Sequence, residues 1–128
     1  MTKLLKVLGI TLLLGGLGHT VGVARLYLTS GVPAADRVMV DLFVAEAQVL
    51  AGGLYFSASR SRSMAWRPLA GFAAVAAIGF ALPSLAFLYS RAPAFFIVPP
   101  AVYFVASAFV LVRLARSHNQ QPKGAVST

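Results

Sequence analysis

Residues 38–56 read VMVDLFVAEAQVLAGGLYF, an apolar run of helical length that carries two acidic side chains, Asp41 and Glu46. About 20 apolar residues are enough for a helix to cross the hydrocarbon layer of a membrane. A carboxylate at that depth is costly, and it usually faces a protein interior or a wet cavity. The stretch therefore predicts a transmembrane helix whose acidic residues mark a functional place.

The composition of the whole chain supports this prediction. Of its 128 residues, 59% are hydrophobic and 11% are charged, whereas about a quarter are charged in soluble domains. The apolar runs predict one domain, residues 1–116, that is an all-α, integral-membrane bundle of four transmembrane helices at about residues 4–28, 38–56, 68–89 and 94–114. We expect residues 117–128 to form a disordered cytoplasmic tail.

The basic residues predict the orientation of the bundle. With both ends inside (N-in/C-in), eight of the eleven lysines and arginines flank the cytoplasmic side, and only Arg25, Arg37 and Arg91 flank the outer side. This is the positive-inside pattern, and it explains the net charge of +8 better than a nucleic-acid partner does. For so short a chain we expect the bacterial inner (cytoplasmic) membrane as the location.

The N-terminus allows a second interpretation. The first 24 residues resemble a signal peptide. They have a basic start at Lys3 and Lys6, an apolar run, and a small-residue cleavage site at residues 22–24 (Gly-Val-Ala). The apolar run continues to Leu28, however, which is longer than an ordinary signal-peptide core. We therefore expect the first helix to be retained.

The polar residues of the first two runs lie at matching depths. His19 and Glu46 each lie about 12 Å from the outer ends of their helices, so we expect them to pair. Arg25 and Asp41 form a second expected pair nearer the surface. Along the second run a 4-3-4 spacing puts four residues on one helix face and leaves Glu46 on a different flank: Asp41, Ala45, Gln48 and Gly52.

These residues predict a polar pocket in the outer half of the bundle, completed by Ser84 and Tyr103 from the third and fourth runs. We assign acid or base roles to Glu46, His19 and Asp41. Ligand-binding roles fall to a second set: Arg25, Gln48, Tyr103 and Ser84. A metal site from the three acid or base residues lacks any characteristic ligand spacing, so we expect none. The chain has no cysteine, which excludes thiol-based centres, and we expect no cofactor.

Glycines and prolines add two expectations about the helices. The spacing of Gly18 and Gly22, and the pair Gly52–Gly53, favour close approach of neighbouring helices. Residues 99–100 (Pro-Pro) fall about six residues into the fourth run and predict an irregular or kinked start. Pro83 is expected to weaken the third helix in the same way.

The chain resembles the small bacterial four-helix membrane proteins of the DoxX-like type. The features that carry the resemblance are Gly-His at residues 18–19, the stretch 41–53, and Gly-Gly-Leu-Tyr at residues 52–55. The resemblance covers nearly the whole chain in length and helix number. It implies a multi-pass membrane protein, with a faint link to quinone or redox chemistry in a few members. Small multidrug exporters also have four helices, but their essential glutamate lies in the first helix, which has none here.

Three classes of function follow from these expectations. The first is the binding of a hydrophobic small molecule such as a quinone, a sterol-like compound or a lipid, with isomerase or epoxide-opening chemistry if the protein is an enzyme. The second is a non-catalytic accessory or assembly subunit of a membrane complex. Separately from its function, we expect that the bundle can form a homo-oligomer. The third is a proton-coupled transporter with Glu46 as the proton carrier.

Overall fold

A computed structural model of the protein describes residues 1–89 and 97–119. Within these ranges the chain forms four helices and no strand: α1 (Thr2–Ser30), α2 (Ala35–Arg60), α3 (Trp66–Tyr89) and α4 (Val98–Asn119). Each helix is long and apolar enough to cross a membrane. The prediction of an all-helical fold with four membrane-length helices is confirmed, and such a set is typical of a multi-pass membrane protein.

The fourth helix differs most from its predicted bounds. It begins at Val98, whereas residues 94–96 lie outside the described residues. Pro99 and Pro100 consequently lie in the first helical turn and not inside the helix. A proline there removes no helical hydrogen bond and does not kink the helix. The predicted irregular start falls partly on residues 94–96, which lie outside the described residues. The helix runs to Asn119, and the rest of the predicted tail, residues 120–128, lies outside the described residues.

Residues 31–34 join α1 to α2 by a short connection. Gly31 adopts a φ of 84°, a conformation that side-chain-bearing residues rarely adopt, and its N–H donates to the carbonyl of Tyr27 at 3.1 Å. Asp36 lies in the first turn of α2, where a negative charge stabilises the positive end of the helix dipole. The short connection makes α1 and α2 antiparallel neighbours.

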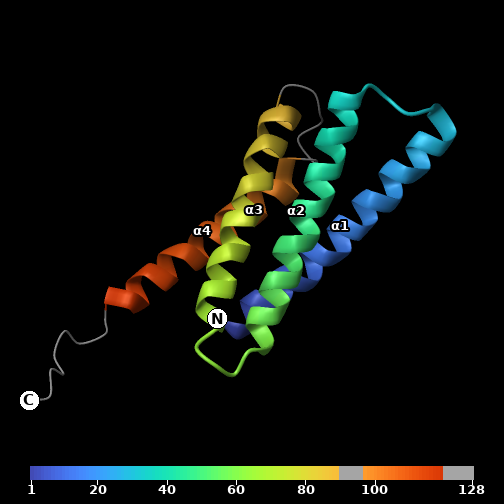
Figure 1. Ribbon diagram of the computed structural model, residues 1–128. Coiled ribbons are helices and arrows are strands. Elements are labelled where there is room, and N and C mark those ends of the chain that lie inside the picture. The colour runs from blue at the N-terminus through green and yellow to red at the C-terminus, as the bar shows by residue number, and fades with distance from the viewer. Residues whose placement is uncertain (90–96, 120–128) are drawn as a thin grey trace, which may run out of the picture.

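The helices pack in chain order, α1 against α2, α2 against α3 and α3 against α4 (Figure 1). The α1–α2 contact is the most extensive, and glycines make it close. A Cβ atom added at Gly9 would lie 2.6 Å from the backbone nitrogen of Phe56, and one at Gly52 would lie 2.6 Å from that of Leu13. The two backbones therefore touch at positions where only glycine fits.

Three further glycines of these helices lack such contacts. Gly18, Gly22 and Gly53 have nothing within 4 Å of an added Cβ. The prediction of close approach is confirmed at Gly52, but within the described residues it is wrong at Gly18 and Gly22, because Gly9 and Gly16 carry the α1 side of the contact. The two unused glycines of α1 lie on its exposed surface.

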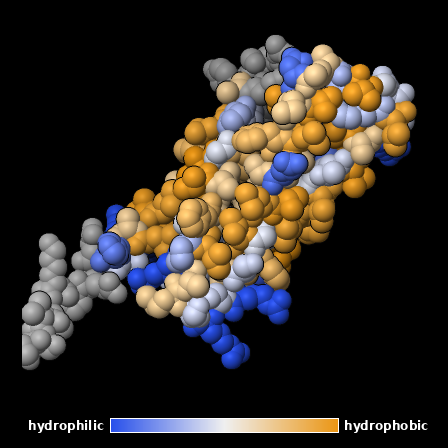
Figure 2. All heavy atoms as spheres, viewed as in Figure 1, coloured by the Kyte–Doolittle hydropathy of each residue, from blue (hydrophilic) through white to orange (hydrophobic). Residues whose placement is uncertain are grey.

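The tightly packed part of the bundle lies toward the end that contains residues 61–65, called the 61–65 end below. The face of α3 there is a ladder of fully buried alanines, at Ala70, Ala73, Ala74 and Ala77, which lets both neighbouring helices approach. Tyr55 of α2 donates a buried hydrogen bond of 2.9 Å to Ser107 of α4. Figure 2 shows apolar side chains over the middle of the visible face and hydrophilic groups toward the ends.

Candidate ligand-binding cavity

The opposite half of the bundle, toward residues 31–34, contains a cavity that is open to the outside. A cavity of about 630 Å³ opens between residues of all four helices. Most of its wall is apolar, from Met39, Val40, Phe43 and Val44 of α2, Phe80 and Pro83 of α3, and Pro99 and Pro100 of α4. Its polar members are His19, Arg37, Asp41, Gln48, Ser84 and Tyr103.

Two aromatic rings line the side of the cavity formed by α3 and α4. The rings of Phe80 and Tyr103 have centroids 6.1 Å apart and are tilted by 56°, a favourable aromatic arrangement. Phe80 is buried and also belongs to the hydrophobic core of the bundle. The hydroxyl of Ser84 donates to the carbonyl of Phe80 at 2.8 Å, which leaves the Ser84 oxygen free only to accept.

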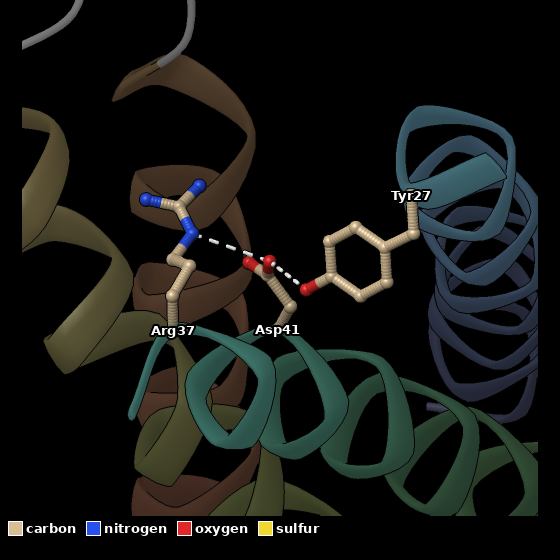
Figure 3. A network of polar contacts seen from close by, with 3 residues as sticks. All are labelled: Tyr27, Arg37 and Asp41. Carbon is tan, nitrogen blue, oxygen red and sulfur yellow. Dashed lines mark hydrogen bonds and ion pairs between the residues drawn. The ribbon is translucent and has the colours of Figure 1, made fainter. Parts of the chain in front are cut away.

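An acid-centred cluster includes two of the cavity-lining residues, Arg37 and Asp41, together with Tyr27 (Figure 3). The hydroxyl of Tyr27 donates to Oδ2 of Asp41 at 2.6 Å, and Nε of Arg37 donates to the same oxygen at 3.2 Å. Asp41 is 8% exposed, whereas the side chain of Arg37 is half exposed. The buried carboxylate is therefore paired and hydrogen-bonded, as a charge in this position requires.

Two polar atoms in the cavity wall have no partner. His19 Nε2 and Gln48 Oε1 are both covered by neighbouring atoms and make no hydrogen bond. They belong to facing stretches of α1 and α2, since an added Cβ at Gly16, one turn from His19, would lie 3.1 Å from the Cβ of Gln48. A buried polar atom without a partner destabilises a protein by about 1–3 kcal/mol, so these two need an explanation.

The cavity includes five of the seven predicted site residues: His19, Asp41, Gln48, Ser84 and Tyr103. Glu46 and Arg25 are absent from its lining, and both are exposed on the outside of the bundle. The predicted ion pairs are not formed. Glu46 has no hydrogen-bond or ion-pair partner among residues 1–89 and 97–119, and Asp41 pairs with Arg37 in place of Arg25.

The pairing of His19 with Glu46 was predicted from depth, and the depth is right. Gly16 packs against Val49, which puts residues 19 and 46 at a common level one turn away. Their directions around the helices differ, however, because Glu46 lies outside the buried face made by Asp41, Ala45 and Gly52. A common level is therefore not enough for contact.

Sequence reasoning missed Tyr27 and Arg37 as members of the polar cluster. The spacing of Arg37 and Asp41, four residues apart on one helix, is a recognised ion-pair spacing and could have predicted their contact. The role of Tyr27 follows from the antiparallel register of α1 and α2, which composition does not reveal.

The polar groups of the cavity differ in how many hydrogen bonds they already form. Within the described part of the chain, no group of three or more histidine, cysteine or acidic residues is placed to hold a metal ion. The carboxylate of Asp41 is engaged by two donors, and Glu46 lies elsewhere. What remains is an apolar chamber with two unpaired polar atoms and two hydroxyl groups.

Comparison of the chain with family models, with curated proteins and with solved structures found no match. The resemblance to DoxX-like proteins therefore stays a prediction.

Proposed function

We propose that the protein is a multi-pass protein of a bacterial cytoplasmic membrane, with both termini inside, that binds a lipophilic small molecule in the 630 Å³ cavity. The observation that carries the proposal is the pair of unpaired polar atoms, His19 Nε2 and Gln48 Oε1, in the wall of a mainly apolar cavity. The volume lies within the range of about 300–1,000 Å³ that is usual for small-molecule sites.

The two unpaired atoms favour a ligand with a hydrogen-bonding polar head. A hydroxyl group accepts from a ring N–H of His19 and donates to Gln48 Oε1. A quinone carbonyl only accepts, and it pairs with the ring N–H of His19 and with the NH₂ group of Gln48 when the amide turns. Both a lipophilic alcohol and a quinone therefore fit, with the apolar body against Phe43 and Phe80.

Contact with the ligand requires a small rearrangement of the cavity wall. Both polar atoms are covered, so the imidazole ring and the amide group rotate about their last side-chain torsions to reach the occupant. Such rotations are local and fast compared with ligand residence. The polar head of the ligand then forms hydrogen bonds with the two atoms that lack partners in the empty protein, and this favours binding.

The experiment is native mass spectrometry of the gently extracted protein with matched variants. The wild type is expected to carry a discrete small molecule, and Gln48→Leu to lose it, because the polar head loses its hydrogen-bond partner on α2. Glu46→Gln changes a residue that does not line the cavity, and it should keep the ligand. An empty wild type, or the loss of ligand from Glu46→Gln but not from Gln48→Leu, would contradict the proposal.

Acid or base catalysis by Glu46 stays a prediction, without a place in the cavity geometry. The same residue favours a second candidate function, a subunit that docks other helices. Glu46 is exposed among the exposed apolar side chains of Leu42 and Leu50, and Gly53 on this helix is open. A carboxyl group facing lipid is unfavourable, and a partner helix would relieve it.

This second candidate is tested by the mass of the detergent-solubilised particle. Light scattering after size-exclusion chromatography should show an assembly larger than one chain, and Glu46→Leu should reduce it, since the polar contact is lost. A monomer for both proteins would remove the docking role without affecting the ligand proposal.

A further inference from the structure

A second cavity of about 340 Å³ lies at the 61–65 end of the bundle, where the first residues of α1 meet α3 and α4. Its lining combines two arginines with apolar and aromatic side chains: Leu4, Trp66, Arg67, Phe109, Arg113 and Leu114. It is separate from the cavity at the 31–34 end and shares no lining residue with it.

Arg67 is the key residue of this cavity. Its Nε is covered by neighbouring atoms and has no hydrogen-bond partner. The guanidinium of Arg67 forms no ion pair among the described residues, and neither does that of Arg113. Two guanidinium groups without an ion pair thus line one cavity: that of Arg67 is partly buried, and that of Arg113 is exposed. Covering the Arg67 group further without an anion would be unfavourable.

No acidic side chain supplies an anion there. All three acidic residues lie between positions 36 and 46, in the first half of α2, which begins at the 31–34 end. The 61–65 end carries basic residues on α1, α2, α3 and α4, and no acidic side chain. Positive-inside topology accounts for exposed arginines such as Arg60 and Arg62, but it does not require two arginines to share a cavity.

Aromatic rings hold the two guanidinium groups in place. The Arg67 guanidinium carbon lies 5.8 Å from the centroid of the Trp66 ring, and that of Arg113 lies 5.6 Å from the Phe109 ring. The planar fork of arginine matches the oxygens of a phosphate group, with which it forms paired hydrogen bonds. The positive end of the α3 dipole, at Trp66, adds to the attraction.

We infer that this cavity binds the phosphate of an anionic lipid headgroup, held by Arg67 and Arg113, with an acyl chain against Leu4, Phe109 and Leu114. Basic pockets between transmembrane helices on the cytoplasmic side are suited to such headgroups. The inference rests on the proposed membrane insertion, and it is independent of what occupies the other cavity.

Trp66, the single tryptophan of the chain, lines the cavity and reports on its occupant. The experiment measures quenching of Trp66 fluorescence in lipid nanodiscs by bromine on the acyl chains of phosphatidylglycerol or phosphatidylcholine. We expect the anionic lipid to quench at a lower mole fraction, on the order of tenfold lower for two arginines. The double variant Arg67→Gln and Arg113→Gln should remove the difference in quenching between the two lipids. The double variant Arg67→Lys and Arg113→Lys should keep part of it.

The control variant carries Arg60→Gln and Arg62→Gln, which change the net charge equally at the same end but outside the cavity. It should keep the preference for the anionic lipid. Equal quenching by both lipids in the wild type would overturn the inference, as would a preference that survives loss of the cavity arginines or disappears with loss of the control pair.

Two further outcomes separate the sources of failure. Quenching by neither lipid would show that Trp66 does not meet acyl chains, and it would remove membrane insertion together with this inference. Inorganic phosphate, added to nanodiscs of phosphatidylcholine and compared with chloride at equal ionic strength, should leave Trp66 emission unchanged. A saturable change would assign the site to soluble phosphate and overturn the lipid assignment.

Discussion

Glu46 and Gln48 are two residues apart on α2 and point to different sides of it, because successive helical residues are rotated by about 100°. Gln48 lines the cavity, whereas Glu46 is exposed. The 4-3-4 spacing of Asp41, Ala45, Gln48 and Gly52 predicts this face from the sequence. The predicted pairing of Glu46 with His19 failed because it used depth alone.

Gln48→Leu tests the cost of the unpaired oxygen in the empty cavity. Because the substitution removes a buried acceptor without a partner, we expect the ligand-free protein to become more stable by about 1–2 kcal/mol. Thermal unfolding of delipidated protein in detergent measures this change. A loss of stability would mean that Gln48 is already satisfied in the empty protein.

Tyr27→Phe tests the acid-centred cluster. The variant loses the 2.6 Å hydrogen bond to Asp41, so its unfolding temperature should fall by a few degrees. Arg25→Gln is the matched control near the same end of α1, since Arg25 forms no ion pair in the described part of the chain. If the unfolding temperature fell more for Arg25→Gln than for Tyr27→Phe, the result would contradict this cluster and support the predicted pairing of Arg25 with Asp41.

At the scale of the elements, the contact between α1 and α2 depends on which glycines face the partner helix. Hydrophobic patterning could not predict this, because every side of a membrane helix is apolar and no periodic contrast separates the buried face from the exposed one. The sequence accordingly predicts four helices and their approximate bounds, but it does not tell Gly16 from Gly18 as the packing residue.

Gly52→Ala and Gly53→Ala form a matched pair that tests this contact. A methyl group at Gly52 meets the backbone of Leu13, so the free energy of unfolding should fall by about 1–3 kcal/mol. At Gly53 the added methyl meets open space, and alanine favours the helix by up to about 1 kcal/mol. Unfolding in detergent with increasing denaturant compares them, and equal destabilisation would contradict the packing described here.

The hydrogen bond between Tyr55 and Ser107 links α2 to α4 across the core. Tyr55→Phe alone leaves the serine hydroxyl buried without this partner and should lower stability by about 1–3 kcal/mol. The double variant with Ser107→Ala should recover most of that loss. A double-mutant cycle measures the coupling, and additive losses would show that the two side chains act independently.

At the scale of the whole molecule, the tightly packed core lies between a larger cavity toward the 31–34 end and a smaller one at the 61–65 end. Alanines and glycines draw the helices together around Leu12, Tyr55 and Phe80. Toward the 31–34 end, bulkier side chains and the prolines of α3 and α4 surround the larger cavity. The sequence predicts five of the polar residues that line the larger cavity. The volume of that cavity depends on the tilt of the helices, which no local sequence pattern encodes.

The most direct test of ligand binding is photocrosslinking from inside the cavity in intact membranes. The photoreactive analogue p-benzoylphenylalanine replaces Phe43, which lines the cavity, or Phe72, an equally apolar and exposed residue of α3 outside it. The account predicts that the Phe43 position forms a discrete adduct with one lipophilic small molecule, and that the Phe72 position forms only a mixture of phospholipid adducts. The same phospholipid mixture at both positions would contradict it.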